Sequence, residues 1–234
     1  GKFYLFQTVD IPEQDVEDIE EFIGVDFGLT DIISTSDNTK HSADWINQYR
    51  EKRQKVRSSI QRKGTRSSKR LLKRLSGKER TTATILNHTI SKSLVQTAKE
   101  QGKGIAIEDL TNIRFTSKRR NKKFRTKLGR WNFGQLRSFL EYKSLLNGVQ
   151  LVVVEPAYTS QTCSCCKHIG KRTNKVFKCT NTNCNVDTID ADYNASKVIS
   201  LLGASVNMPE KSDMYCSLHS YSGLKPTPSL CVGG

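Results

Sequence analysis

The chain has 234 residues, 35% of them hydrophobic, and a formal net charge of +15. This is enough length and apolar content for one folded domain with small insertions. No apolar run is long enough to span a bilayer and no segment is typical of a signal peptide, which argues against a membrane protein or a secreted precursor.

The amino-terminal part of the chain predicts a strand, a linker and a hairpin. Residues 2–9 alternate loosely and are expected to form a strand, and residues 12–21 an acidic linker. Residues 22–28 are typical of a buried strand that ends in a carboxylate and a turn. Residues 31–36 are expected to return as the second strand of a hairpin.

Basic and amphipathic helices are predicted next. Residues 45–75 consist of helix formers with sparse apolar positions, and a turn at Gly64 predicts a basic helical hairpin. Residues 82–100 carry apolar side chains at intervals of four, which predicts a separate helix facing the core. A short strand over 105–108 follows and again ends in a carboxylate.

Helices and strands are also expected to alternate in the carboxy-terminal part of the chain. A helix is predicted over 133–146 with Gly148 as its C-cap, followed by a strand over 149–155 that is buried on both faces. After a cysteine module, a helix is expected over 191–202, and the chain from residue 203 on is expected to be loose. Strands alternating with helices indicate an α/β domain with a mixed sheet.

The positive charge is concentrated in two blocks. Residues 45–80 hold fourteen basic and two acidic side chains, and residues 111–130 hold nine basic and no acidic ones. Either block could be a solvated surface or a flexible arm. Aromatic residues interleaved with both blocks favour a groove that follows phosphates and stacks bases, so nucleic acid is the expected partner. The side chains predicted to contact nucleic acid are Arg50, Lys52, Arg53, Lys55, Arg57, Lys69, Arg70, Arg119, Arg120, Lys122, Lys123, Arg125 and Trp131.

Five of the seven cysteines lie within one short segment. Cys163-x2-Cys166 and Cys179-x4-Cys184 are separated by twelve residues, a spacing close to that of a zinc ribbon. Four thiolates suit a tetrahedral zinc ion, and a small hairpin without its own core needs such a crosslink. A disulfide framework is the alternative, which a single cysteine cluster in a basic chain makes less favourable. We therefore predict one structural Zn²⁺.

Neighbouring residues leave the ligand set open. Cys165 could replace Cys163 or be free, and His168 is a weaker substitute ligand. Lysines of the module are expected to surround the zinc and offset the thiolate charge. They are Lys167, Lys171, Lys175 and Lys178.

Three carboxylates occupy positions where a hydrolytic metal site needs oxygen ligands from separate elements. Asp26 ends a hydrophobic strand and is followed by Gly28, which would let a phosphate backbone approach. Glu108 ends another strand, and Asp192 lies in the first turn of a helix with Asp190 near its N-cap. Each alone has an ordinary explanation, as a turn residue or as a helix cap. As a set beside two basic blocks, they predict a site that gathers Mg²⁺.

Four motifs occur in a specific order between residues 24 and 202. They are Gly24-Val-Asp26-Phe-Gly28, Ile107-Glu108-Asp109-Leu110, Tyr158-Thr-Ser-Gln161 leading into Cys163, and Asp192-Tyr-Asn194-Ala-Ser196. This combination resembles the TnpB (OrfB) proteins of insertion sequences, which are similar to the type V CRISPR effector nucleases. The resemblance implies an RNase H-like (RuvC) nuclease domain that cuts DNA guided by a bound RNA.

The resemblance also implies roles for the three acids. Asp26 would bridge two Mg²⁺ ions and Glu108 and Asp192 would each hold one side, with products that carry 5′-phosphate and 3′-hydroxyl ends. The chain departs from the family in its x4 second knuckle, where x2 is typical, and in Asp190, which could share the role of Asp192.

The resemblance further implies an organisation of the chain. Residues 1–21 are expected to be the end of a preceding wedge-like region and a linker, and residues 203–234 a flexible tail. The RuvC-like domain would span 22–202, with a basic helical insertion at 45–80 and a zinc ribbon at 159–190. We therefore expect a carboxy-terminal fragment or a shortened relative.

The expected function is that of a Mg²⁺-dependent, RNA-guided DNA endonuclease domain, with DNA and guide RNA as partners. It would be cytoplasmic, and nucleoid-associated when bound to DNA. A non-cleaving nucleic-acid-binding accessory or regulator of transposition is the alternative. A structure-selective resolvase that needs no guide is a weaker third possibility.

Overall fold

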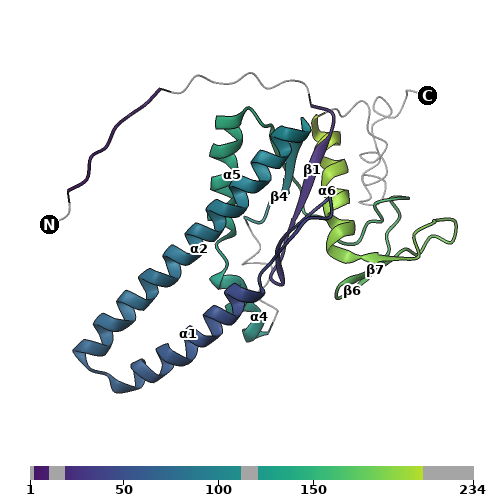
Figure 1. Ribbon diagram of the computed structural model, residues 1–234. Helices are drawn as coiled ribbons and strands as arrows, with labels where there is room; N and C mark the ends of the chain where they lie inside the picture. Colours follow the sequence, from purple (N-terminus) through teal and green to yellow (C-terminus); the bar gives the residue numbers. More distant parts are fainter. Residues whose placement is uncertain (1–2, 11–18, 112–120, 208–234) are drawn as a thin grey trace.

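The computed structural model describes residues 3–10, 19–111 and 121–207 (Figure 1). Predictions for the linker over 12–18, the block over 112–120 and the tail from 208 on lie outside these residues. The predicted strand over 2–9 is wrong for residues 3–9, which form no regular element and are exposed. None of the helices in the described ranges is long and apolar enough to cross a membrane.

The larger sheet has five strands in the order β3-β2-β1-β4-β5. The hairpin of β1 (Phe22–Phe27) and β2 (Asp31–Thr35) is antiparallel, as predicted, and β3 (Lys40–Ser42) continues it beyond β2. On the other side of β1, β4 (Gly104–Glu108) and β5 (Leu151–Val154) are each parallel to their neighbour. The predicted mixed sheet is confirmed.

Both faces of this sheet are covered by helices. Alternation along β1 and β4 directs Val25 and Ile107 into a core built with α2 (Arg66–Gln101) and α5 (Phe133–Asn147). On the opposite face, Phe22 and Ala106 pack with Ile199 of α6. Helix α6 (Ala191–Asn207) lies along β1, as Figure 1 shows, and extends past the predicted end at residue 202.

The basic hairpin is present, but its second helix is longer than predicted. Helix α1 (Asp44–Lys63) ends at Gly64, which adopts a left-handed conformation with φ of 65°, and the Thr65 side chain caps α2. The two helices form an arm that projects away from the sheet (Figure 1). The expectation of separate helices is wrong, because α2 runs unbroken for 36 residues from the arm into the core. Gly77 is the weakest helix former near the junction, and a single glycine does not stop a helix.

The remaining elements refine the predictions. The short helix α4 (Lys122–Arg130), which begins at the capping side chain of Asn121, was not anticipated. Helix α5 ends at Gly148 with φ of 66°, as predicted. The predicted burial of β5 on both faces is wrong for three of its four residues, because β5 is an edge strand and only Val154 is fully buried.

The cysteine module forms a second, three-stranded antiparallel sheet. Its strands are β6 (Lys171–Thr173), β7 (Val176–Lys178) and β8 (Thr188–Asp190). Because β8 runs directly into α6, this small sheet is fixed to the helix that packs on β1.

Candidate active site and cysteine cluster

Asp26 and Glu108 come from neighbouring parallel strands. Val25 of β1 is paired with Ile107 of β4, so the next residue along each strand is a carboxylate at the same edge of the sheet. Asp26 is partly exposed, and Glu108 is 9% exposed. The two acids that the sequence placed at strand ends are therefore neighbours in space.

Asp192 reaches this edge because α6 lies unusually close to β1. A Cβ atom at Gly24 would lie 1.9 Å from the backbone oxygen of Ser196 in α6, so only glycine permits this approach. Asp26 and Asp192 then line one pocket of about 350 Å³. Glu108 lines an adjoining pocket of about 530 Å³, and Phe27 contributes to both.

Gly28 lines the smaller pocket, but the turn itself requires a glycine. A Cβ atom there would lie 2.5 Å from the backbone oxygen of Asp31. The tight turn between β1 and β2 thus accounts for Gly28 without the phosphate approach that the sequence suggested.

The electrostatics of the site reflect crowded acids. Burial raises the pKa of Asp26 well above its ordinary value, and the negative charges of Glu108 and Asp192 add to this shift. Burial also raises the pKa of Glu108, although the hydroxyl of Thr159 donates to Glu108 Oε1 at 2.5 Å and opposes the shift. The pocket therefore favours a bound cation or proton.

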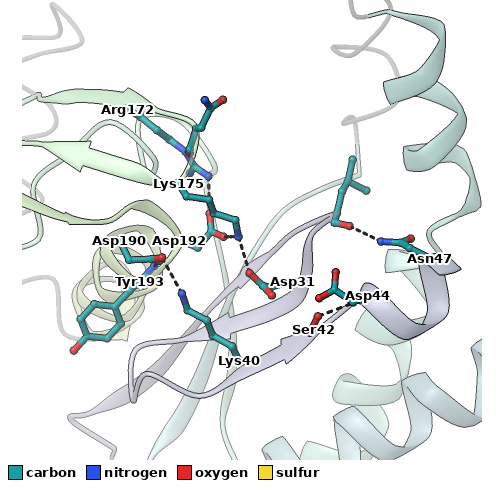
Figure 2. A network of polar contacts seen from close by, with 12 residues as sticks. Asp31, Lys40, Ser42, Asp44, Asn47, Arg172, Lys175, Asp190, Asp192 and Tyr193 are labelled. Carbon is teal, nitrogen blue, oxygen red and sulfur yellow. Dashed lines mark hydrogen bonds and ion pairs between the residues drawn. The ribbon is translucent and has the colours of Figure 1, made fainter.

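Two cations from the β6–β7 hairpin already contact Asp192 (Figure 2). Nη2 of Arg172 donates to Asp192 Oδ1 at 2.6 Å, and Nζ of Lys175 contacts Asp192 Oδ2. The same Nζ lies 2.6 Å from Asp31 Oδ2. Although burial opposes it, the hydrogen bonds to Asp192 and Asp31 raise the pKa of Lys175.

The three carboxylates lie in one region, but their oxygen atoms are not all as close together as the ligands of one metal ion. Among the described residues, the groups of three or more candidate ligands whose atoms all lie within 4.8 Å of one another do not include these acids. Arg172 and Lys175 instead provide the positive charge at Asp192.

Asp190 has a capping role. Its Oδ1 accepts from the backbone nitrogen of Tyr193 at 2.9 Å, and its Oδ2 pairs with Lys40 at 2.9 Å. Against the opposing effect of burial, these contacts lower the pKa of Asp190. It acts as the predicted N-cap of α6, and it is not among the residues that line the pocket with Asp26.

The four predicted cysteines come together. The sulfur atoms of Cys163, Cys166, Cys179 and Cys184 all lie within 4.8 Å of one another. Two of these separations are 3.9 Å, between Cys163 and Cys184, and 3.5 Å, between Cys166 and Cys179. Since Zn–S bonds of about 2.3 Å at tetrahedral angles place sulfurs roughly 3.8 Å apart, this donor set fits zinc.

The thiols of the cluster are electrostatically unequal. Although burial opposes the change, the backbone N–H of His168 and the neighbouring thiols lower the pKa of Cys166 to about 6. Burial raises the pKa of Cys179 to about 12. Cys165 and His168, the alternative ligands, are exposed and lie outside the group of four.

Asn194 joins the cysteine cluster to α6. Its buried side-chain amide donates to the backbone oxygen of Thr162 at 2.7 Å and accepts from the backbone nitrogen of Ser164 at 2.9 Å. These hydrogen bonds flank Cys163. The residue two positions after Asp192 therefore holds the first cysteine knuckle in place.

The residues predicted to contact nucleic acid differ in their exposure to solvent. Those on the arm and α4 that are exposed are Lys52, Lys55, Lys69, Arg70, Lys122 and Arg125. Arg50, Arg53 and Arg57 are half-buried, and Arg57 pairs with Glu79 of α2 at 3.0 Å. Arg119, Arg120 and the side chain of Lys123 lie outside the described residues.

The aromatic ring of Trp131 is not accessible for stacking on a nucleic-acid base. Its side chain is 4% exposed and belongs to the core between the arm and the sheet. The Arg50 guanidinium lies 4.8 Å from the ring centroid, and Phe133 stacks at 5.8 Å. The prediction that Trp131 stacks on a base is wrong, because both sides of the ring pack against protein.

Several residues near the acids were not predicted. Thr159 stands 51 residues from Glu108, and Lys175 stands 144 residues from Asp31, so no local pattern links them. Lys175 was expected to offset thiolate charge but points to Asp192.

The chain is similar to proteins of known class. Residues 133–199 match the family model described as Cas12f1-like, TNB domain. A TnpB-like protein of Methanocaldococcus jannaschii is 34% identical over 171 residues, which cover 72% of this chain and 61% of that protein. The endodeoxyribonuclease Cas12f1 of Sulfoacidibacillus thermotolerans is 29% identical over 86% of this chain and 50% of its own length.

A solved structure agrees with the fold. The cryo-EM structure of a Cas12f1–sgRNA–target DNA complex matches with a TM-score of 0.62 at 20% identity, over 82% of this chain and 51% of that chain. The chain thus spans about half to three fifths of the length of these relatives. Residues 133–199 are thus similar to the Cas12f1-like TNB family, and the resemblance of the chain to TnpB proteins and the related type V effectors is confirmed.

Proposed function

We propose that this chain contains the RuvC-like nuclease part of a Mg²⁺-dependent, RNA-guided DNA endonuclease. The observation that carries the proposal is the convergence of Asp26, Glu108 and Asp192 at one edge of the sheet, where each acid comes from a different element. The name of the relative from Sulfoacidibacillus thermotolerans, an endodeoxyribonuclease, supports the reaction class.

The residues present fit divalent cations. Burial raises the pKa of Asp26 and of Glu108, neighbouring carboxylates raise that of Asp26 further, and Asp192 already attracts two side-chain cations, so the group of acids favours a positive charge. Carboxylate oxygens are the ligands that Mg²⁺ prefers. Asp26, Glu108 and Asp192 would hold two Mg²⁺, which when bound supply Lewis-acid activation of water and stabilise charge on the phosphate.

The chain's own residues orient the reaction. Thr159 holds one oxygen of Glu108, which fixes the direction of the other. Hydrolysis consumes one water and breaks one P–O bond of the DNA backbone, which leaves a 5′-phosphate and a 3′-hydroxyl. Arg172 places its guanidinium in the same pocket as Asp26 and Asp192, where a phosphate would need positive charge.

The cysteine cluster would hold one structural Zn²⁺. With four protein sulfurs the coordination is complete, so the ion has no open position for substrate. Through Asn194 and β8, it stabilises the connection that carries Asp192. The RuvC-like domain over 22–202, with its arm and its zinc ribbon, would thus bring metal, acids and nucleic acid together.

The test measures whether cleavage of DNA depends on its match to the bound RNA. RNA that co-purifies with the full-length protein is sequenced, and DNA that matches it is compared with scrambled DNA in the presence of Mg²⁺. We expect wild-type protein to cut only the matching DNA and Asp26→Ala to bind it without cutting. Salt-sensitive binding with no cutting by wild type would favour the non-cleaving accessory, and cutting of a Holliday junction without RNA would favour a resolvase.

A further inference from the structure

Both oxygens of the Asp192 carboxylate are engaged by the β6–β7 hairpin. Arg172 donates to Oδ1 at 2.6 Å and Lys175 contacts Oδ2, while the Asp192 side chain is only 9% exposed (Figure 2). A divalent cation needs at least one of these oxygens. Because an ammonium group and a metal ion repel each other on one oxygen, metal binding at Asp192 favours the departure of one side-chain cation.

Lys175 is better suited to move than Arg172. Its Nζ lies 2.6 Å from Asp31 Oδ2, so a second carboxylate is already within reach, and its side chain is 41% exposed. Nε of Arg172 instead donates to the backbone oxygen of Asn174 at 3.3 Å, which holds the guanidinium in the hairpin. A lysine ammonium is also a compact charge on a flexible stem, whereas a guanidinium is a rigid fork.

The backbone of Lys175 is fixed while its side chain spans two acids. Its carbonyl oxygen accepts from the backbone nitrogen of Ala191 at 2.8 Å, directly before Asp192. Asp31 begins β2 in the larger sheet, whereas Asp192 lies on α6. The side chain can therefore shift its charge from one carboxylate to the other without movement of the hairpin.

We propose that Lys175 is an exchangeable cation, which covers Asp192 until a divalent metal ion binds and then rests on Asp31. The inference rests on the proposed metal site. It predicts two changes of metal affinity in opposite directions. Loss of the Lys175 charge should tighten metal binding, and loss of the Asp31 charge should weaken it, because Lys175 then has no alternative partner.

The first test measures Mn²⁺ binding to the full, zinc-loaded chain without nucleic acid, by the electron paramagnetic resonance signal of free Mn²⁺. We expect Lys175→Met to lower the Kd for Mn²⁺ roughly fivefold, since a competing cation is removed. The matched control is Lys178→Met, which removes the same charge from the same hairpin at an exposed residue that pairs with Asp187 at 3.6 Å. We expect it to change the Kd less than about twofold.

The second test is a double-mutant cycle. Asp31→Asn should raise the Kd for Mn²⁺ about threefold in the wild-type background and have little effect in the Lys175→Met background. A general loss of negative charge would instead weaken binding equally in both backgrounds. Lys175→Gln should reproduce Lys175→Met, and circular dichroism with zinc content shows that each variant is folded.

The outcomes separate the inference from the proposed function. If Mn²⁺ binding depends on Asp26 but Lys175→Met behaves like Lys178→Met, the metal site stands and the exchangeable cation is refuted. Equal effects of Asp31→Asn in both backgrounds would refute it as well. If Asp26→Asn leaves Mn²⁺ binding unchanged, the carboxylate site fails and the inference fails with it.

Discussion

At the scale of single residues, the site is a set of acids that folding brings together at an energetic cost. Burial and two neighbouring carboxylates raise the pKa of Asp26, and burial raises that of Glu108. A carboxyl group whose pKa is raised by folding stabilises the protein below its ordinary pKa of about 4, and this contribution is lost as the pH rises through the raised value. The site thus trades stability of the magnesium-free protein for affinity toward cations.

The first prediction concerns Asp26 without magnesium. Asp26→Asn removes a charge that is unfavourable above the ordinary carboxyl pKa, so its melting temperature at neutral pH should exceed that of wild type by about 2–4 °C for each kcal/mol relieved. The difference should vanish below a pH of about 4. Thermal unfolding of zinc-loaded protein with magnesium omitted measures this effect.

The control for this prediction is a neighbouring exposed acid. Hydrogen bonds from Thr111 and the charge of Arg137 lower the pKa of Asp109, so Asp109→Asn should not stabilise the protein. Added Mg²⁺ should raise the melting temperature of wild type but not of Asp26→Asn. Equal stabilisation by both substitutions would contradict the conclusion that the charge of Asp26 is unfavourable because of its surroundings.

The second prediction concerns Gly24. A Cβ atom there meets the α6 backbone at 1.9 Å, so Gly24→Ala should reduce the free energy of unfolding by about 2–3 kcal/mol. Gly77→Ala is the matched control, because a Cβ there meets no atom within 4 Å in the middle of α2. The control should stabilise the helix by about 0.5–1 kcal/mol, and urea unfolding measures both.

At the scale of elements, α6 connects the acidic pocket to the cysteine cluster. It follows β8 directly, packs on β1, and presents Asp192 to the pocket and Asn194 to the cysteine knuckle. Asn194 is fully buried, and both the nitrogen and the oxygen of its side-chain amide are hydrogen-bonded. It therefore fixes the position of the knuckle relative to the helix.

The third prediction follows from this connection. Asn194→Ala leaves the Thr162 carbonyl and the Ser164 N–H without their partner, which should cost about 1–3 kcal/mol of unfolding free energy. The variant should also release zinc faster to a chromogenic chelator. Asn185→Ala, at an exposed position of the same module, is the control and should change neither quantity.

Local sequence patterns predicted those elements well whose structure depends on residues close together in the sequence. The hairpin of β1 and β2, strand β4, the cap of α5 at Gly148 and the four-cysteine group all depend on short spacings. Patterns failed where tertiary contacts decide. Helix α2 continues through Gly77, with buried residues on both sides of it, and Trp131 is buried because the arm packs over it.

Contacts between distant segments lie beyond such patterns. The Thr159 bond to Glu108 and the Lys175 contacts with Asp31 and Asp192 join different elements across the fold. A sequence shows residue types at these positions, but the side-chain directions depend on how the small sheet sits beside β1.

At the scale of the whole molecule, opposite charges are separated. The arm of α1 and α2 projects away from the sheet (Figure 1) and carries exposed lysines and arginines. Asp26 and Glu108 instead lie at the ends of neighbouring strands. The net charge of +15 thus hides an uneven distribution, with a strongly basic arm and a group of acids at the strand ends. We expect the arm to set the affinity for nucleic acid and the pocket to set the chemistry.

The fourth prediction tests this division. Replacement of Lys52, Lys55, Lys69 and Arg70 by glutamine should weaken binding to all sequences alike. The slope of log K against log salt should fall by roughly 0.7–0.9 for each phosphate that the arm no longer neutralises. Lys103→Gln and Lys197→Gln, outside the arm, serve as controls, and fluorescence anisotropy over a salt series measures the slope. Loss of cutting with unchanged binding in the arm variant would show that the division is wrong.

The central claim is that Asp26, Glu108 and Asp192 act as one metal-dependent site. Single-turnover cleavage of bound DNA is measured over a Mg²⁺ titration for wild type and for Asp26→Ala, Glu108→Ala and Asp192→Ala, with DNA binding measured in parallel. We predict Mg²⁺-dependent cutting by wild type, and a loss of at least about a hundredfold in each variant with binding within about twofold of wild type. Wild-type rates in any one variant, or cutting by wild type without a divalent cation, would contradict the claim.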